Sequence, residues 1–207
     1  MEIGGFQKFS LIDYPGSISA VVFTRGCNFR CPFCHNPELV LPEFYSDTLD
    51  PEEILGFLEK RIGKLESVTI TGGEPTIQKG LIPFMEKLKG MGYMIKLDTN
   101  GTKPEIIGKI VEKNLADFIA MDIKAPLESY SRISGVSVDL SAIEKSISII
   151  LDSGKKYQFR TTLDPALHTD HMRWEIEGWM AKLNAEHIFQ DFVPGKTVEA
   201  FSAVSHF

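Results

Sequence analysis

The segment "SVTITGGEP" at residues 67–75 shows the pattern that decides the fold: a short apolar run that ends in glycine and a polar side chain. Its first five residues are rich in β-branched side chains, which is typical of a buried strand. Five other runs along the chain have the same character. They are "ISAVVF" (18–23), "MIKLD" (94–98), "FIAMD" (118–122), "YQFRTT" (157–162) and "HIFQDF" (187–192). The sequence therefore predicts six strands.

Amphipathic segments lie between several of these runs. One of them begins with Asp50, Pro51 and two glutamates, a capping residue followed by a first-turn proline and early acids. Apolar residues at helical spacing continue this segment, and they recur at 106–111, 140–150 and 172–183. The Met and Trp side chains of the last segment are expected in the core, because they share one helix face.

Alternation of strands and helices predicts a right-handed α/β fold with parallel strands. A closed eight-stranded barrel normally needs about 250 residues and roughly 200 at the least, whereas this chain has 207 residues. An open partial (β/α)6 barrel fits this length better, and an open doubly wound sheet is the alternative. We expect a single domain that spans residues 1–207.

Composition excludes some classes of protein. Hydrophobic residues make up 43% of the chain and charged residues 24%, as in an ordinary globular domain. The net charge of −6 argues against a nucleic-acid partner, which needs a positive surface. No apolar run approaches the length of a membrane span, and the first residues do not resemble a secretory signal. A cytoplasmic protein is expected.

Polar and glycine-rich clusters follow the predicted strands. In a parallel α/β fold the carboxyl ends of the strands form one edge, and binding sites are built there. Segments that are distant in the sequence should therefore meet at this edge. They are "TGGEP" (71–75), "DTNG" (98–101), "MDIKAP" (121–126) and "FVPG" (192–195), together with Arg160, His168 and the cysteines after the first run.

Each cluster also has a purely structural interpretation. Gly72 and Gly73 suit a strand-to-helix turn that needs positive φ. Asp122 and Lys124 are two residues apart in a strand, so they face the same side and can form a simple ion pair. The other candidates are open to the same interpretation: Asp98 as a turn residue, and Arg160 and His168 as structural or solvated side chains.

The segment "RGCNFRCPFCHNP" (25–37) holds every cysteine of the chain, Cys27, Cys31 and Cys34, with the spacing C-x3-C-x2-C. Cysteines packed this closely make poor disulfide partners, so the pattern indicates metal or redox chemistry. A zinc site would recruit His35 as a fourth ligand. An iron–sulfur cluster suits clustered thiolates better, and with three thiolates one iron keeps an open coordination site.

These motifs resemble those of a known family. The cysteine spacing, with Phe33 before the last cysteine, and the downstream "GGEP" resemble the signatures of the radical S-adenosylmethionine (radical SAM) superfamily. "GFQKFSLIDYPG" (5–16), "DTNG", "MDIKAP" and "RTT" (160–162) extend the likeness to glycyl-radical-enzyme activases. Among these, the chain is most similar to activating proteins of anaerobic ribonucleoside-triphosphate reductase. The resemblance implies an open partial barrel of the radical SAM type.

The resemblance also implies how the cofactors are held. Cys27, Cys31 and Cys34 would hold a [4Fe–4S] cluster, whose unique iron takes the amino and carboxylate groups of S-adenosylmethionine. Phe33 would lie near the adenine. The turn at Gly72, Gly73 and Glu74 would approach the methionine moiety, and the Glu74 carboxylate would receive its ammonium group.

Seven other residues receive roles from the same resemblance. Three would line a monovalent-cation site beside the cofactor, and one would neutralise the cofactor carboxylate. Two would approach the ribose and adenine, and one, in a loop near the entrance, would meet the substrate. In that order they are Asp98, Thr99 and Asp122; Lys124; Arg160 and His168; and Asp13.

The implied reaction begins with one-electron reduction of the cluster by a low-potential donor such as flavodoxin or ferredoxin. Cleavage of S-adenosylmethionine then yields a 5′-deoxyadenosyl radical, which takes a hydrogen from a glycine α-carbon of a partner enzyme under anaerobic conditions. No catalytic side chain beyond the cluster and cofactor is required.

The alternatives are an activase of pyruvate formate-lyase or another glycyl radical enzyme, a radical SAM enzyme acting on a small molecule or peptide, and a zinc-stabilised binding module.

Overall fold

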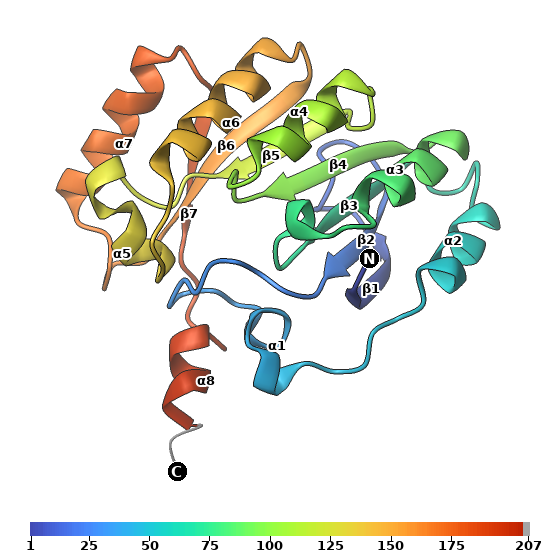
Figure 1. Cartoon of the computed structure of the whole chain (residues 1–207), viewed down its shortest axis with the longest axis horizontal. Coiled ribbons are helices and arrows are strands. Elements are labelled where there is room, and N and C mark those ends of the chain that lie inside the picture. Colours follow the sequence, from blue (N-terminus) through green and yellow to red (C-terminus); the bar gives the residue numbers. More distant parts are fainter. Residues whose placement is uncertain (205–207) are drawn as a thin grey trace.

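The protein is seen here in a computed structural model, which describes the backbone of residues 1–204 and the side chains of residues 1–201. Its centre is a seven-stranded sheet whose spatial order follows the chain, from β1 to β7 (Figure 1). The strands are β1 (Ile3–Ser10), β2 (Ser19–Thr24), β3 (Ser67–Gly72), β4 (Met94–Thr99), β5 (Phe118–Asp122), β6 (Lys156–Leu163) and β7 (His187–Asp191).

The helices connect these strands or follow the last one. The α-helices are α1 (Pro37–Val40), α2 (Pro51–Glu59), α3 (Leu81–Gly90), α4 (Pro104–Glu112), α5 (Tyr130–Ser134), α6 (Leu140–Asp152), α7 (Asp170–Lys182) and α8 (Val198–Val204). Short 3-10 turns are η1 (Pro42–Phe44), η2 (Pro75–Ile77) and η3 (Leu127–Ser129). None of the described helices is long and apolar enough to cross a membrane.

The six predicted strands are β2 to β7, and all five of their pairings are parallel, as expected. β1 was not predicted. It pairs antiparallel with β2 and adds a seventh strand at the edge of the sheet. Its sequence, "IGGFQKFS", contains two glycines and three polar residues, so it lacks the apolar run that marks the buried strands.

The strand order decides between the two predicted architectures. A doubly wound sheet reverses its strand order at a switch point, whereas here the order never reverses. Right-handed crossovers in a constant direction place their helices on the same face of the sheet. Figure 1 shows α3, α4, α6 and α7 together on that face. β1 and β7 are not hydrogen-bonded to each other, so the barrel is open and partial, as predicted.

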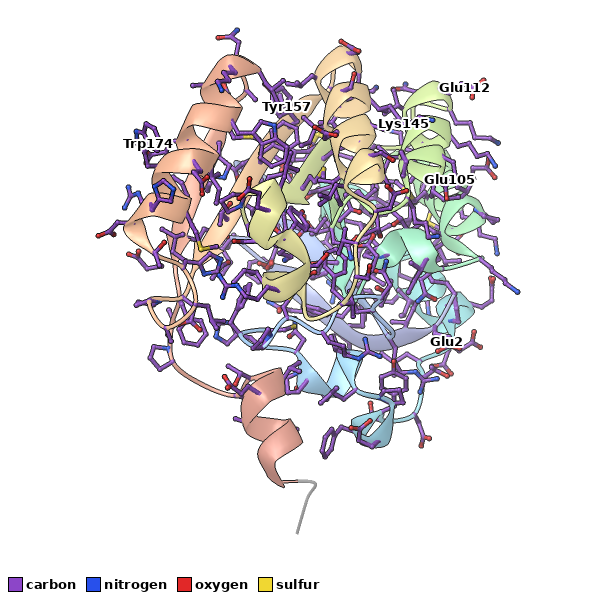
Figure 2. All side chains as sticks on the ribbon, turned by 60° about the vertical axis from the view of Figure 1, so that its left-hand side comes forward. Glu2, Glu105, Glu112, Lys145, Tyr157 and Trp174 are labelled. Atoms are coloured by element: carbon purple, nitrogen blue, oxygen red, sulfur yellow. The ribbon has the colours of Figure 1, made fainter. Side chains whose placement is uncertain are left out.

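Local capping explains where the longer helices begin. Asp50 accepts a hydrogen bond from the Glu52 N–H before α2, and Asp139 caps α6 in the same way. Thr169 accepts from the Met172 N–H at the start of α7. The buried face of α7 is narrower than expected, because Leu183 is 39% exposed. Figure 2 shows Trp174 pointing away from the sheet on the outer side of α7.

The main core lies between these helices and the outer face of the sheet. Alternate strand residues point toward the helices, and the opposite set faces the concave side. Burial of this apolar surface is the main stabilising contribution to the fold. Buried members from strands and helices include Ile95, Leu97, Ile119, Met121, Phe159, Ile107, Ile110, Ile147, Ile150 and Ile176.

Candidate functional site

A cavity of about 290 Å³ lies at the carboxyl ends of the parallel strands. The loops after β2 to β5, two residues of β6 and one residue of β7 contribute to its lining, as expected from a shared strand edge. Of the predicted site residues, all but Asp13 and His168 line it. The predicted residues in the lining are Cys27, Cys31, Phe33, Cys34, Gly72, Gly73, Glu74, Asp98, Thr99, Asp122, Lys124 and Arg160.

The three cysteines lie on the loop that follows β2. The Phe29 N–H points at the Cys27 sulfur at 3.3 Å, and the Arg30 guanidinium donates to the carbonyl oxygens of residues 27 and 29, each at 2.7 Å. Burial raises the pKa of the Cys27 thiol to about 12 and that of Cys31 to about 11. Without a bound cation these thiols are protonated, so metal binding releases protons.

His35 is engaged elsewhere. Its Nε2 lies 2.7 Å from the Val193 carbonyl oxygen, and its ring stacks on Phe192 with centroids 5.1 Å apart. Within residues 1–201, no three His, Cys, Asp or Glu side chains are grouped so that they could hold a single metal ion. The Cys3His zinc alternative is therefore not supported. Three soft thiolate donors around one cavity, without a fourth, fit an iron–sulfur cluster with one open iron.

The double glycine brings the end of β3 against the start of the cysteine loop. A Cβ at Gly72 would lie 2.6 Å from the Thr24 nitrogen, and one at Gly73 would lie 2.0 Å from the Gly26 oxygen. Gly72 also has a φ of 106°, which side chains rarely adopt. The Gly73 N–H donates to the Thr24 carbonyl, and the Glu74 N–H donates to the Gly26 carbonyl, each at 2.8 Å. This contact positions the cysteine loop.

The Glu74 carboxylate is 1% exposed and is held by four donors. Its Oε1 accepts from the Thr76 N–H (2.9 Å), the Thr76 hydroxyl (2.5 Å) and the Thr99 hydroxyl (2.8 Å), and its Oε2 accepts from the Asn100 N–H (2.6 Å). Burial raises the pKa of Glu74, and these donors oppose that rise. Glu74 thus ties the turn after β3 to the end of β4, and Oε2 keeps unused acceptor capacity.

A chain of five alternating charges crosses the concave face of β4, β5 and β6. Lys96 and Asp98 are 2.8 Å apart, and Arg160 bridges Asp98 (Nη2 to Oδ2, 3.2 Å) to Asp122 (Nε to Oδ1, 2.5 Å). Lys124 completes the chain, 2.9 Å from Asp122 Oδ2. Burial alone would raise the pKa of Asp122, but the adjacent Arg160 and Lys124 hold it well below its usual range.

The arrangement of this charge chain differs from the monovalent-cation site that the resemblance implied. Asp98 and Asp122 direct their oxygens to basic side chains, and the Thr99 hydroxyl donates to Glu74. In the structure the three expected ligands do not converge on one position, because Arg160 lies between the two carboxylates. Lys124 acts on the Cys31 thiol as a nearby positive charge, so it is placed to balance negative charge in the cavity.

His168 lies behind the cavity wall. Its ring packs edge-on against Phe33 with centroids 5.6 Å apart. Its Nδ1 accepts from the Asp164 N–H at 3.1 Å, and its Nε2 lies 2.9 Å from the Lys124 carbonyl oxygen. A neutral ring with its proton on Nε2 satisfies both contacts. The ring supports Phe33 and Lys124 and does not line the cavity, and its approach to ribose or adenine stays a prediction.

Asp13 lies at the opposite edge of the sheet. Because β1 runs antiparallel to β2, the loop between them lies at the amino ends of the parallel strands. The Asp13 carboxylate accepts a hydrogen bond from the Ser10 hydroxyl, and the neighbouring Tyr14 packs on Phe118, the first residue of β5. Asp13 does not line the cavity, and its contact with a substrate stays a prediction. Its loop closes the amino end of the half-barrel.

Some residues in and around the cavity were missed by the sequence reasoning, and of those described here Asn100 lines it. Lys96 is buried and begins the charge chain, and its signal was a lysine two residues before Asp98 within an apolar strand. Asn100 donates from its side chain to Asn28 at 2.9 Å, and the Asn28 amide donates to the Thr102 hydroxyl at 2.8 Å. These contacts tie the cysteine loop to the β4 loop, and no residue pattern marks them.

Residues 21–180 match the model of a protein family that is described as "Radical SAM superfamily". This segment holds the cysteine loop and β2 to α7, which is more than half of the chain. The chain belongs to the radical SAM superfamily. Membership in this family implies a [4Fe–4S] cluster and S-adenosylmethionine, which agrees with the three-thiolate cavity described above.

Similar proteins differ in what their names describe. A protein of Methanocaldococcus jannaschii, provisionally named a glycyl-radical enzyme activating enzyme, is 36% identical over 168 residues, which cover 79% of this chain and 68% of that protein. A 7-carboxy-7-deazaguanine synthase of Thermococcus kodakarensis is 27% identical over 174 residues, 74% of this chain and 67% of that protein. The names therefore include a protein-activating enzyme and a small-molecule enzyme.

Solved structures support the fold. The structure of native anSMEcpe with bound AdoMet superposes with a TM-score of 0.65 at 16% identity. The superposition covers 81% of this chain but only 49% of that chain, so the protein spans about half the length of this structural relative. At this identity the likeness shows the shared open sheet and nothing finer.

Proposed function

We propose that this radical SAM protein is a glycyl-radical-enzyme activase. The observation that carries the proposal is that the three cysteines and the Gly72–Glu74 turn line one cavity. The similarity to the Methanocaldococcus jannaschii protein, at 36% identity, supports an activase within the superfamily. We propose anaerobic ribonucleoside-triphosphate reductase as the partner, on the strength of the motifs in the sequence, and the cytoplasm as the compartment.

When bound, the cluster and S-adenosylmethionine supply a 5′-deoxyadenosyl radical after one-electron reduction, and that radical takes a glycine α-hydrogen. The chain's own part is to bind and orient. Cys27, Cys31 and Cys34 would hold the cluster. Lys124, beside Cys31, would balance the cofactor carboxylate. The buried walls would keep water from the radical.

The turn after β3 would hold the methionine end of the cofactor. Backbone groups of Gly72 and Gly73 line the cavity without side chains, so a ligand can approach them closely. The remaining acceptor capacity on Glu74 Oε2 would receive the cofactor ammonium, a charge-assisted contact. Phe33, which His168 supports from behind, would pack near the adenine.

The side chains on the concave face would serve the rest of the cofactor. Arg160 lines the cavity at the centre of the charge chain and would approach the ribose. A monovalent cation beside the cofactor requires Asp98, Thr99 and Asp122 to turn from their present partners. Its presence is tested by comparing cofactor affinity in sodium, potassium and a large organic cation.

The deciding experiment is electron spin resonance on candidate partners. The protein is reconstituted anaerobically with iron and sulfide, reduced with dithionite and mixed with S-adenosylmethionine and a panel of glycyl radical enzymes. A glycyl radical on the reductase, with release of 5′-deoxyadenosine, is the expected result. If deoxyadenosine forms but no partner gains a radical, the activase assignment fails.

Matched variants test the cluster. Cys27→Ala, Cys31→Ala and Cys34→Ala should each abolish cluster binding, measured as iron and acid-labile sulfide per chain. His35→Ala should retain both, because His35 is held by Val193 and Phe192 and is not a ligand. One zinc per chain without sulfide would support the zinc-stabilised module.

A second candidate is a radical SAM enzyme for a small molecule. The observation that favours it is the 27% identity to the Thermococcus kodakarensis 7-carboxy-7-deazaguanine synthase over 74% of this chain. Under this hypothesis, deoxyadenosine release accelerates with a small purine-like substrate and not with any partner enzyme. Mass spectrometry of the small-molecule panel, run beside the partner panel, distinguishes the two.

A further inference from the structure

A second groove lies outside the cysteine loop, next to the first residues of α3 and α4. Its volume is about 560 Å³, and its charged lining residues are Lys79, Lys103 and Glu105. Lys79 is exposed and Lys103 is half-buried. In the part of the chain that the structure describes, neither lysine forms an ion pair. Their charges are available to a partner.

The segments around this groove contain few acidic residues. Asp and Glu are absent from residues 25–37, 75–85 and 99–104, although the whole chain has 28 acidic and 22 basic residues. Glu74 is buried and faces the inner cavity. Glu105, at the rim, is the nearby acid that opposes the two lysines. A locally positive surface on a protein of net charge −6 would favour an acidic partner.

The groove and the cofactor cavity lie on the two sides of the same loop. Cys27 lines the inner cavity, and the next residue, Asn28, lines the outer groove. Asn28 is fixed in this position by hydrogen bonds to Asn100 and Thr102. A protein seated in the groove is therefore separated from the group held by the cysteines by the thickness of one loop.

We propose that this groove docks a small acidic protein that carries a single electron. The proposal rests on the proposed function, because only a reducible group at the cysteines needs such a carrier. One electron leaves the reduced carrier and enters the group held by the cysteines; no bond forms or breaks and no proton is required. Charge complementarity at the rim speeds encounter and orients the carrier.

Electron delivery and substrate access are separated by this arrangement. The glycine of a partner enzyme has to reach the inner cavity, whereas the groove opens on the outer side of the loop. Carrier and partner enzyme can then bind at the same time. This favours the carrier over the partner enzyme as the occupant of the groove.

The test measures binding of a flavodoxin of net negative charge by titration calorimetry, with and without the reconstituted cluster. The double variant Lys79→Glu/Lys103→Glu should bind about tenfold more weakly at low ionic strength. Wild type should approach the variant in 0.5 M salt, because salt screens exposed charges. Glu105→Lys should bind more tightly than wild type; Figure 2 shows Glu105 on the outer side of α4.

The matched control is Lys60→Glu/Lys156→Glu, which changes the net charge equally at the amino ends of β3 and β6. Its flavodoxin affinity should equal that of wild type. Equal weakening in both double variants, or in neither, overturns the proposal. Weaker binding of the partner enzyme, with unchanged flavodoxin binding, also overturns it and assigns the groove to that enzyme.

Dithionite separates this proposal from the proposed function, because a small reductant needs no docking surface. All variants should release 5′-deoxyadenosine at the wild-type rate with dithionite, and only the groove variant should be slow with reduced flavodoxin. Slow release from the groove variant with dithionite would overturn the docking proposal. Glycyl-radical formation is measured in a separate assay. A protein that fails to activate any partner enzyme can therefore be distinguished from one that fails to bind the electron carrier.

Discussion

Gly73 lies where two backbone segments touch, and this leaves no room for a side chain. A Cβ at this position would lie 2.0 Å from the Gly26 carbonyl oxygen, which is backbone and cannot rotate away. Gly73→Ala should therefore displace the cysteine loop, destabilise the protein by about 1–3 kcal/mol and lower the iron content per chain. The measurements are urea denaturation and iron analysis after reconstitution.

Gly56, in α2, provides the control, since a Cβ there would meet nothing within 4 Å. Gly56→Ala should stabilise the protein by about 0.5–1 kcal/mol, because alanine favours the helix interior. Its iron content should be unchanged. Equal iron content in both variants would contradict the role given to Gly73.

His187 links stability to pH at the amino edge of the sheet. Its Nε2 lies 2.9 Å from the Thr161 hydroxyl, and burial lowers the pKa of His187 to about 4 from its ordinary 6.5. A histidine whose folded pKa is lowered favours folding when neutral, so its contribution is complete above pH 6.5. It is lost as the pH falls toward 4.

The variant His187→Gln should remove this part of the pH dependence. The free energy of unfolding is measured by denaturation from pH 7 to 4 for both proteins, and the difference between the two curves is compared. The difference should shrink as the pH falls. A constant difference would show that His187 does not titrate in this range.

At the scale of elements, Arg160 joins three strands through charge. It bridges carboxylates on β4 and β5 from its own position on β6. Arg160→Met should destabilise the protein by about 3–5 kcal/mol, because it leaves two buried carboxylates short of a partner. Adding Asp122→Asn should recover part of the loss. Urea denaturation of the cluster-free protein measures both effects.

Arg173→Met, in α7, is the control for losing an arginine. Its ion pair with Glu177 is exposed, so its loss should cost less than about 1 kcal/mol. Similar losses in both arginine variants would mean that the buried charge chain contributes little.

The helices and strands also show which parts of the fold and of the site could be predicted from the sequence. The strands β2 to β7 were predictable because each is a short apolar run, and convergence of their carboxyl ends follows from parallel order alone. β1 lacks that run, so the sequence did not show that the loop holding Asp13 follows an antiparallel edge strand. The partners of Glu74 and Arg160 depend on register between strands, which the composition of a single strand does not contain.

At the scale of the whole molecule, the helix α8 contacts the cysteine loop, which lies far from it in the sequence. The Val198 N–H donates to the Cys34 carbonyl, and the Glu199 N–H donates to the Pro32 carbonyl, each at 3.0 Å. Val198 packs with Val40 in a small buried cluster. Figure 1 shows the resulting placement of α8 beside α1, far from its neighbours in sequence.

Val198→Asp should detach α8 from this loop, because an unpaired charge is costly in an apolar contact. We expect the reconstituted cluster to lose its absorbance faster in air than in wild type. Glu199→Gln is the control, since its side chain is exposed and its backbone contact is kept. Equal bleaching rates in all three proteins would show that α8 does not shield the loop.

The position of α8 also bears on the order of biosynthesis. Residues 197–201 are translated after every strand of the sheet, yet they supply backbone donors to the loop that carries the cysteines. During synthesis the sheet can form while this loop still lacks its cover. The contacts of α8 with the cysteine loop can therefore form only after the residues of the whole sheet have been synthesised.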